Sequence, residues 1–197
     1  YNWQRLAERD FDWWRNRVED AGRSYHAYRI DHVLGFFRIW TVPRGNFSGI
    51  PGFFWPQRGI GIDDFRDAGF DHGRVRWLSE PHIPGDLLRE KLGEPTLTRL
   101  TGPVFRRLPD EDLYVFSDSI TGENEIRKLQ EEDEVRDWLV EQYRDRALIL
   151  LPDGTYASSW TFRDCSRYRT LRESEKERFE ELVARAGAAS NELWADH

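Results

Sequence analysis

The sequence has a single cysteine, Cys165, and no methionine among its 197 residues. One thiol cannot form an internal disulfide or a thiolate metal site, which excludes a disulfide scaffold and favours a reducing compartment, so the cytoplasm is the expected location. The chain begins with a tyrosine and lacks methionine throughout, so we expect it to be an excised segment of a longer protein.

Long apolar runs are also missing. The longest aliphatic run is Ala147 to Leu151, far below the roughly 20 residues that cross a bilayer, and no charged-then-apolar leader precedes the first expected helix. There is no glycine-rich phosphate-binding loop, no histidine pair at metal-ligand spacing and no flanking signature around Ser158, Ser159 or Cys165. We therefore expect no membrane segment, no metal, no cofactor and no serine or cysteine nucleophile.

Basic residues are outnumbered, 29 against 36 acidic residues, for a net charge of −7. A negative surface repels phosphate backbones, so nucleic acid is not an expected partner. Only Lys91, Lys128 and Lys176 are lysines, so the cations are mostly arginines, whose forked guanidinium groups suit carboxylates and hydroxyls. Aromatic residues make up 14% of the chain, which indicates a folded globular protein of about one domain.

Hydrophobic periodicity predicts a mixed α/β fold. Apolar spacing of three and four predicts helices over 7–25, with Asp10 as the cap, and over 84–92 and 131–143, and a capping box at Ser174-Glu-Lys-Glu177 opens the last helix. Residues 27–39 predict a strand, 147–151 and 155–160 predict a hairpin, and Pro43 to Pro56 predicts an ordered loop.

The segment Tyr28-Arg-Ile-Asp-His-Val-Leu-Gly-Phe-Phe-Arg-Ile-Trp40 places charges within an apolar run. On a strand, Arg29 and Asp31 would share one side about 7 Å apart, a gap that a guanidinium can span. The cation would keep the carboxylate ionised, as a nucleophilic aspartate requires. A buried structural ion pair is the other interpretation. His32 would lie at the strand end, and Gly35 would permit a sharp turn or a close backbone approach.

Aromatic side chains stack on the apolar faces of sugars, while arginine, aspartate and histidine bind hydroxyls. A carbohydrate cleft and a hydrophobic core are both open interpretations of the rings in the first third of the chain. The candidates are Trp3, Phe36, Phe37, Trp40, Phe53, Phe54 and Trp55.

Three motifs together resemble a known family: Tyr1-Asn-Trp3, Asp12-Trp-Trp14 and the segment 28–40. They resemble the 4-α-glucanotransferases (amylomaltases, disproportionating enzymes) of glycoside hydrolase family 77. The similarity is strongest over residues 1–43. Residues 77–93 and Asn191-Glu-Leu-Trp194 also look like the branch that contains the plant cytosolic disproportionating enzyme, in which a long insertion follows this strand.

The resemblance implies a (β/α)8 barrel with catalytic residues at the carboxyl ends of strands. It implies that Asp31 is the nucleophile, that Arg29 supports it, that His32 contacts the donor sugar and that Trp3 lines the cleft. The implied reaction transfers α-1,4-glucan segments between malto-oligosaccharides by a retaining double displacement. No cofactor is implied.

The sequence departs from a complete member of the family. The general acid/base glutamate belongs to a Glu-Asp-Leu-Gly type motif that does not occur here, and the carboxylate that stabilises the transition state is expected beyond His197. We therefore expect a partial barrel with a long α+β insertion, inactive without the remainder of the parent enzyme. Its expected parts are the nucleophile segment 1–43, the insertion 44–150 and a hairpin and helix over 151–197 that return towards the barrel.

Two other functions stay open. The segment would be a non-catalytic carbohydrate-binding or interaction module if it kept the strand without the chemistry. An α-amylase-type hydrolase would share the covalent mechanism but release free reducing sugar in place of redistributed chains.

Overall fold

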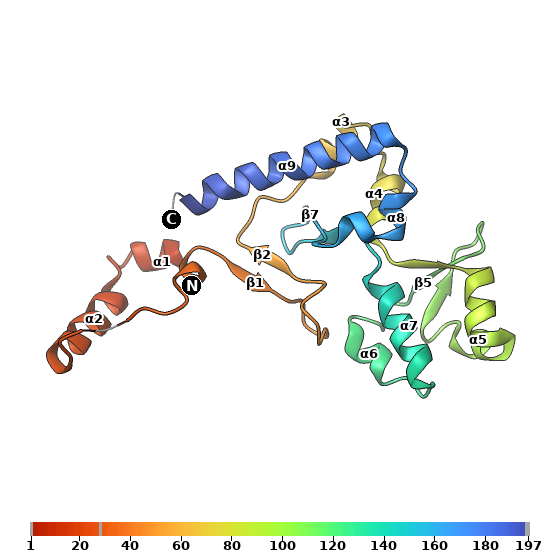
Figure 1. Cartoon of the computed structure of the whole chain (residues 1–197), viewed down its shortest axis with the longest axis horizontal. Helices are drawn as coiled ribbons and strands as arrows, with labels where there is room; N and C mark the ends of the chain where they lie inside the picture. The colour runs from red at the N-terminus through yellow and green to blue at the C-terminus, as the bar shows by residue number, and fades with distance from the viewer. Residues whose placement is uncertain (1, 28, 196–197) are drawn as a thin grey trace. The chain divides into compact units, whose positions relative to one another are not determined.

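The computed structural model describes residues 2–27 and 29–195, apart from the side chains of residues 3, 4, 194 and 195. The chain divides into two compact units, Tyr1–Ile39 and Trp40–His197. Figure 1 shows the elements of each unit. Because the two units are separate bodies, each is described by itself.

The first unit contains two helices and one 3₁₀ turn: α1 (Trp3–Ala7), α2 (Asp12–Ser24) and η1 (Val33–Phe36). The helix predicted over 7–25 corresponds to α2, but Asp10 is not its cap. Asp10 and Phe11 both have left-handed backbones, with φ of 49° and 52°, so the chain turns there and α2 begins at Asp12. Two consecutive left-handed residues cannot continue a right-handed helix.

The strand predicted over 27–39 is wrong. Residues 29–32 have no regular structure, η1 follows them, and a strand begins only at Ile39. A strand needs a neighbour for its N–H and C=O groups, and no strand occurs among the described residues of 2–38. The expected burial of this segment is also wrong, since Ile30 is 57% exposed.

The second unit carries three small sheets and seven α-helices among its described residues. The sheets are β1 (Ile39–Thr41) with β2 (Phe53–Trp55); β3 (His82–Pro84), β5 (Leu113–Phe116) and β4 (Phe105–Arg107), in that order; and β6 (Leu148–Leu150) with β7 (Tyr156–Ser158). The helices are α3 (Ile62–Asp67), α4 (His72–Ser79), α5 (Gly85–Leu100), α6 (Glu123–Arg127), α7 (Asp133–Arg144), α8 (Ser166–Arg169) and α9 (Glu173–Ala195), with the 3₁₀ turn η2 (Phe162–Asp164) before α8.

Two hydrophobic clusters form most of the core. One joins α3 and α4 to β6, α8 and α9 through residues such as Phe65, Leu78, Leu148 and Phe179. The other lies wholly within 83–143, where α5, α6 and α7 pack with the β3-β5-β4 sheet. Residues before 80 and after 146 therefore share one core, and the stretch between them builds a second.

His82 lies where the two clusters meet. Its ring centroid is 4.0 Å from that of Trp77, its Nδ1 bonds the Glu80 carbonyl at 2.9 Å, and Arg167 donates to its backbone carbonyl. Burial lowers the pKa of His82 below its ordinary value, and the charge of Arg167 lowers it further. The imidazole is therefore neutral near pH 7 and packs as an aromatic ring.

Most local predictions in the second unit are confirmed. Helix α7 matches 131–143, and β6 and β7 pair antiparallel across a turn in which Gly154 has φ 83°. The helix predicted over 84–92 stops at Gly93 (φ 72°), but helical structure resumes after it, so α5 extends to Leu100 with a kink. The last helix begins at Glu173, and Glu175 accepts the Arg172 N–H, so the cap lies two residues before the predicted box.

The expected loop from Pro43 to Pro56 is only partly a loop. Its last aromatic residues form β2, because Phe53 is buried among Ile149, Leu151 and Ala157. The fold is mixed α and β as predicted, and the β3-β5, β4-β5 and β6-β7 pairs are all antiparallel. Within the described residues no sheet closes into a barrel, and no helix combines the length and apolarity that a bilayer span requires.

A fully buried carboxylate, Glu123, ties the loop after β1 to α6 and α7. It accepts the backbone N–H groups of Phe47 and Ser48 at 3.2 Å each, the Ser48 hydroxyl at 3.1 Å and Arg144 Nε at 2.6 Å. Burial alone would raise the pKa of Glu123, but the hydrogen bond and charge of Arg144 and the two N–H groups outweigh it, so the pKa lies below its ordinary value.

We predict that Glu123→Ala lowers the free energy of unfolding of the Trp40–His197 unit by about 3–5 kcal/mol, because it leaves Arg144 unpaired in a mostly buried site. Amide exchange at Phe47 and Ser48 should accelerate. In the wild type this contribution is present at neutral pH and is lost as the pH falls through the lowered pKa of Glu123.

Glu177→Ala, an exposed change on α9, is the control and should alter stability by less than about 0.5 kcal/mol. Denaturant unfolding and hydrogen exchange measure both variants. Equal changes in the free energy of unfolding for the two substitutions would show that Glu123 does not hold the loop after β1 to α6 and α7.

Candidate functional site

Arg29 and Asp31 are in contact, as the sequence predicts, but on irregular backbone and not on a strand. Arg29 Nε lies 2.7 Å from Asp31 Oδ1, and Arg29 Nη2 donates to Asp31 Oδ2 at 3.0 Å. The side chains are 84% and 71% exposed, so they do not fix a buried strand. An exposed pair contributes about 0–1 kcal/mol to stability, so within this chain the pair is not a buried structural one.

His32 begins the tight turn that follows Asp31. Its backbone is left-handed (φ 55°), and its carbonyl accepts the Gly35 N–H at 2.9 Å. A Cβ at Gly35 would fall 2.7 Å from His32 Cδ2, so glycine lets the imidazole lie against the backbone. The sharp turn and the close approach were the two interpretations of Gly35, and both occur: the backbone turns here and the His32 imidazole packs against it.

Two predicted residues lie outside what the structure describes. Trp3 belongs to α1, but its side chain is not among the described ones, and Tyr28 is outside the described residues. Phe36 lies within the first unit, with its ring centroid 5.1 Å from that of Trp14 on α2. This contact joins η1 to α2.

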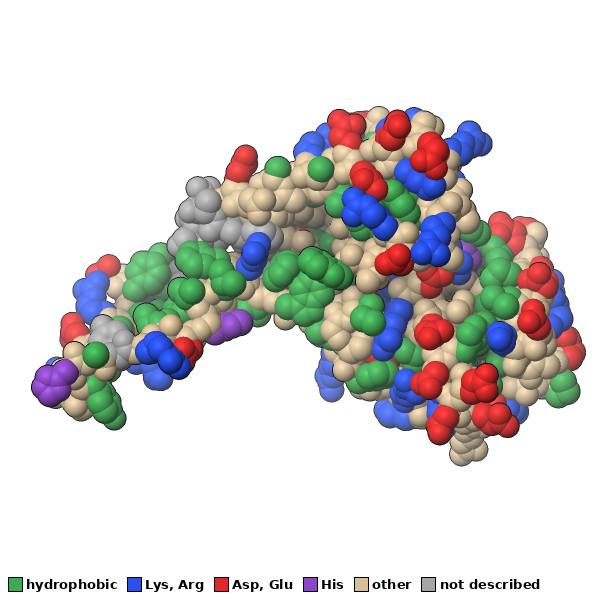
Figure 2. Space-filling model, viewed as in Figure 1, with side chains coloured by type: hydrophobic (Ala, Val, Ile, Leu, Met, Phe, Trp, Pro, Cys, Tyr) green, Lys and Arg blue, Asp and Glu red, His purple; other side chains and the backbone are tan. Residues whose placement is uncertain are grey.

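None of the described side chains of residues 2–39 is buried. Figure 2 shows hydrophobic side chains on the surface in the region of α1 and α2. An apolar surface of this kind marks an interaction site with other protein or a ligand. The large exposed apolar residues of this unit are Phe11, Trp13, Val18, Tyr25, Ile30, Val33, Leu34 and Ile39.

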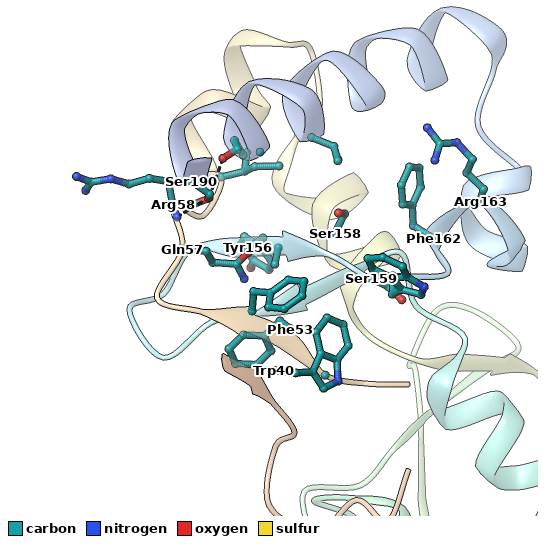
Figure 3. Close-up of a pocket in the computed structure, with 18 residues that line it drawn as sticks. Trp40, Phe53, Gln57, Arg58, Tyr156, Ser158, Ser159, Phe162, Arg163 and Ser190 are labelled. Atoms are coloured by element: carbon teal, nitrogen blue, oxygen red, sulfur yellow. Dashed lines mark hydrogen bonds between the residues drawn. The ribbon is translucent and has the colours of Figure 1, made fainter. Parts of the chain in front are cut away.

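The second unit contains a cavity of about 440 Å³ between β1, β2, β7 and α9. Figure 3 shows Trp40, Phe53 and Tyr156 near the strands and Ser190 on the helix above them. The lining combines rings with hydroxyl, amide and guanidinium groups. Its aromatic and polar members are Trp40, Phe53, Phe54, Gln57, Arg58, Tyr156, Ser158, Ser159, Trp160, Phe162, Arg163 and Ser190.

Three of the predicted aromatic candidates, Trp40, Phe53 and Phe54, line this cavity. Trp55 does not, and its ring packs on Phe53 with centroids 6.5 Å apart. Trp160, the last residue of the predicted hairpin, was not among the predicted candidates, and it lies more than 100 residues after these rings. Only the pairing of distant segments brings it to the cavity.

Trp40 is held in one orientation. Its Nε1 donates to the Gly49 carbonyl at 3.0 Å, and its ring meets those of Phe54 and Trp160 edge-on, at 5.0 and 6.0 Å. A Cβ at Gly52 would fall 2.6 Å from Trp40 Cε2, so glycine makes room for the indole. The ring is therefore positioned before any ligand arrives.

Cys165 is buried, and burial raises the pKa of its thiol to about 12, which disfavours the thiolate that a nucleophile needs. Among the described residues, no three histidine, cysteine or carboxylate side chains lie together as a metal site would need.

The stretch Glu111-Asp-Leu-Tyr114 differs from the absent acid/base motif by a tyrosine in place of glycine. It lies before β5 and enters it, whereas barrel catalytic residues follow their strands. Asp112 pairs with Arg89 at 2.8 and 2.9 Å. This stretch is a turn tied to α5 and gives no support to an acid/base role.

Comparison with known proteins gives the family. A family model described as 4-alpha-glucanotransferase, glycoside hydrolase family 77, matches residues 1–196, and the chain belongs to that family. The predicted family is therefore confirmed. No solved structure matches the chain.

Curated relatives match different shares of the chain. 4-alpha-glucanotransferase DPE2 of Oryza sativa is 28% identical over 190 residues, which cover 89% of this chain and 20% of the relative. The chloroplastic/amyloplastic DPE1 of Arabidopsis thaliana is 40% identical over 104 residues, 51% of the chain and 18% of the relative. The Chlamydia pneumoniae 4-alpha-glucanotransferase is 48% identical over 50 residues, 24% of the chain and 10% of the relative. The chain thus spans no more than a fifth of these relatives, and the predicted plant branch is matched along most of it.

We predict that Gly52→Ala displaces the Trp40 indole, because the added methyl group would overlap the ring. The indole N–H resonance of Trp40 in a ¹⁵N correlation spectrum should shift as its bond to Gly49 is lost. Gly22→Ala, where the added Cβ meets nothing within 4 Å, is the control and should leave that resonance in place. An unchanged Trp40 resonance in Gly52→Ala would contradict the packing described for this ring.

Proposed function

We propose that this chain supplies the nucleophile of a 4-α-glucanotransferase that transfers α-1,4-glucan segments between malto-oligosaccharides. The observation that carries the proposal is the exposed, two-point Arg29–Asp31 pair in a chain that belongs to the family. Such a pair adds little stability, whereas a reacting carboxylate must be accessible to substrate and held in one orientation.

In the proposed mechanism an Asp31 carboxylate oxygen attacks the anomeric carbon of the donor. The bond from that carbon to the leaving 4-oxygen breaks, and a general acid protonates the leaving glucan. The 4-hydroxyl of a second glucan then attacks the covalent ester, gives its proton to the same group and regenerates the Asp31 carboxylate. Two inversions leave the α-configuration retained.

Three residues are proposed to support the nucleophile. Arg29 orients the carboxylate through its two hydrogen-bonding nitrogens. His32 is proposed to contact the donor sugar, a role that rests on the family resemblance, and the structure places its imidazole over the Gly35 turn that follows Asp31. Trp3 lines the cleft, a role that rests on the family resemblance alone.

The proposed site also needs the remainder of the parent enzyme. We assign 1–43 to the nucleophile segment of a partial (β/α)8 barrel, 44–150 to an insertion and 151–197 to a hairpin and helix that return towards the barrel. The absence of buried side chains among the described ones of 2–39 supports a unit completed by other protein. The acid/base glutamate is assigned to that other part, so this chain alone is proposed to be inactive. The proposed location is the cytoplasm, consistent with one free, buried cysteine.

We predict that a fluorinated α-glucosyl donor labels the complete parent enzyme at Asp31, because fluorine slows hydrolysis of the ester and lets it accumulate. Peptide mass spectrometry locates the label. Asp31→Asn should abolish labelling and reduce transfer by roughly 10⁴-fold or more.

The matched control is Asp20→Asn, which alters another exposed carboxylate paired with an arginine, Arg23 at 3.0 Å. Its labelling and activity should equal those of the wild type. A label on any other residue would overturn the assignment of Asp31.

We also predict that the parent enzyme converts maltotriose into a ladder of shorter and longer chains with little increase in reducing ends. Transfer keeps the number of glycosidic bonds constant, whereas hydrolysis lowers it. Chromatography and a reducing-end assay on the same sample measure both quantities. Reducing ends rising in step with maltotriose loss would favour the hydrolase, and absence of any product would favour a non-catalytic module.

A further inference from the structure

Helix α9 leaves the cavity of the second unit open. The residues that it turns towards the cavity are the small or slender Val183, Ala186, Gly187 and Ser190, at the spacing of one helix face. Gly187 lies inside the helix, where glycine is unfavourable relative to alanine. A Cβ built on Gly187 meets nothing within 4 Å, so packing does not require glycine there. The face of α9 at Gly187 is therefore open towards the cavity.

The opposite wall presents two indole rings. Trp40 and Trp160 meet at an interplanar angle of 87°, and Trp160 is 74% exposed. The loop that accepts the Trp40 N–H is itself bound to the buried Glu123 through Phe47 and Ser48. A ring held as Trp40 is can stack on a ligand with little loss of side-chain freedom, and the exposed face of Trp160 is accessible to the same ligand.

The polar groups of the cavity suit a neutral ligand with hydroxyl groups. Arg163 is already bound to Glu180 by two hydrogen bonds of 3.1 and 3.0 Å. Ser190 Oγ is fixed between the Arg58 N–H and the Ala186 carbonyl. Gln57 Nε2 is buried without a hydrogen-bond partner in the described structure, so it is a donor that an incoming oxygen would satisfy.

None of the residues that line the cavity carries a carboxylate. Glycosidic bond cleavage or transfer uses two carboxyl groups, so the cavity has the composition of a binding site without chemistry. Its volume of about 440 Å³ falls within the roughly 300–1,000 Å³ of small-molecule sites.

We propose that this cavity binds a segment of an α-1,4-linked glucan, with Trp40 and Trp160 stacking on sugar faces and Gln57 binding a hydroxyl. The choice of an α-glucan rests on the proposed function, while the cavity itself does not. The site would hold a glucan chain through its binding alone, without breaking a bond.

The test is calorimetric titration of the 197-residue chain with maltoheptaose. We expect saturable binding that Trp160→Ala weakens about fivefold or more, since one stacking ring is lost. Gly187→Trp should fill the cavity and abolish binding, whereas Gly187→Ala should leave binding intact and raise the Tm. Glu177→Ala, which changes an exposed side chain of α9 that does not line the cavity, should leave binding unchanged.

This binding measurement is separate from the covalent labelling that tests Asp31, so either proposal can fail while the other stands. Absence of saturable binding by the wild type, or binding that is insensitive to Trp160→Ala, would overturn the proposal. Should the wild type not bind while Trp160→Ala lowers the Tm of the parent enzyme, the cavity is a contact with other protein. Trp160 is exposed, so its variant gives a result even where Gly187→Trp fails to fold.

Discussion

The buried carboxylate of Glu123 is the interaction on which the arrangement of the second unit depends. A carboxylate with no exposed surface is stable only when its hydrogen-bonding capacity is filled, and here Arg144, two backbone N–H groups and a hydroxyl fill it. Three of those four donors belong to the loop after β1. The loop then presents the Gly49 carbonyl to Trp40. A charge buried between α6 and α7 therefore determines the orientation of an indole at the cavity, far from it in sequence.

The second unit has a buried core and the described part of the first has none, and this difference determines the backbone conformation of residues 29–32. The described side chains of 2–39 include none that is buried, so no packing forces residues 29–32 into a strand. What remains is local chemistry: a guanidinium spanning two residues to a carboxylate, and a glycine that lets an imidazole fold over the next turn. Both contacts form without a core, because they need only residues that are close in the sequence. The predicted strand does not form, because its hydrogen bonds need a second strand.

The same distinction explains how much could be predicted from the sequence. The β6–β7 hairpin, helix α7 and the Arg29–Asp31 contact were all predictable, since each depends on residues close in the chain. The Glu123 anchor joins residues 75 to 76 apart, and no periodicity marks a glutamate in a short helix as buried. Trp160 reaches the cavity only through the pairing of 147–158. The strand predicted over 27–39 was wrong because the apolar composition of the segment indicates burial between neighbours, and the described residues of 2–38 provide no neighbouring strand.

Charge and stacking occur on separate parts of the chain. The first unit offers an accessible carboxylate oriented by an arginine but no buried contact. The second offers aromatic rings and one unsatisfied polar donor, Gln57, yet no carboxylate in its cavity. Glycosyl transfer in general uses a reacting carboxylate together with a surface that binds more distant sugars, because those distant contacts supply binding energy that the reacting bond cannot. A ring array that needs no charge can be rigid and stable by itself, whereas a nucleophile must remain accessible. That difference fits a cavity built on a hydrophobic core, and it fits the proposal that Asp31, on a turn, is the nucleophile.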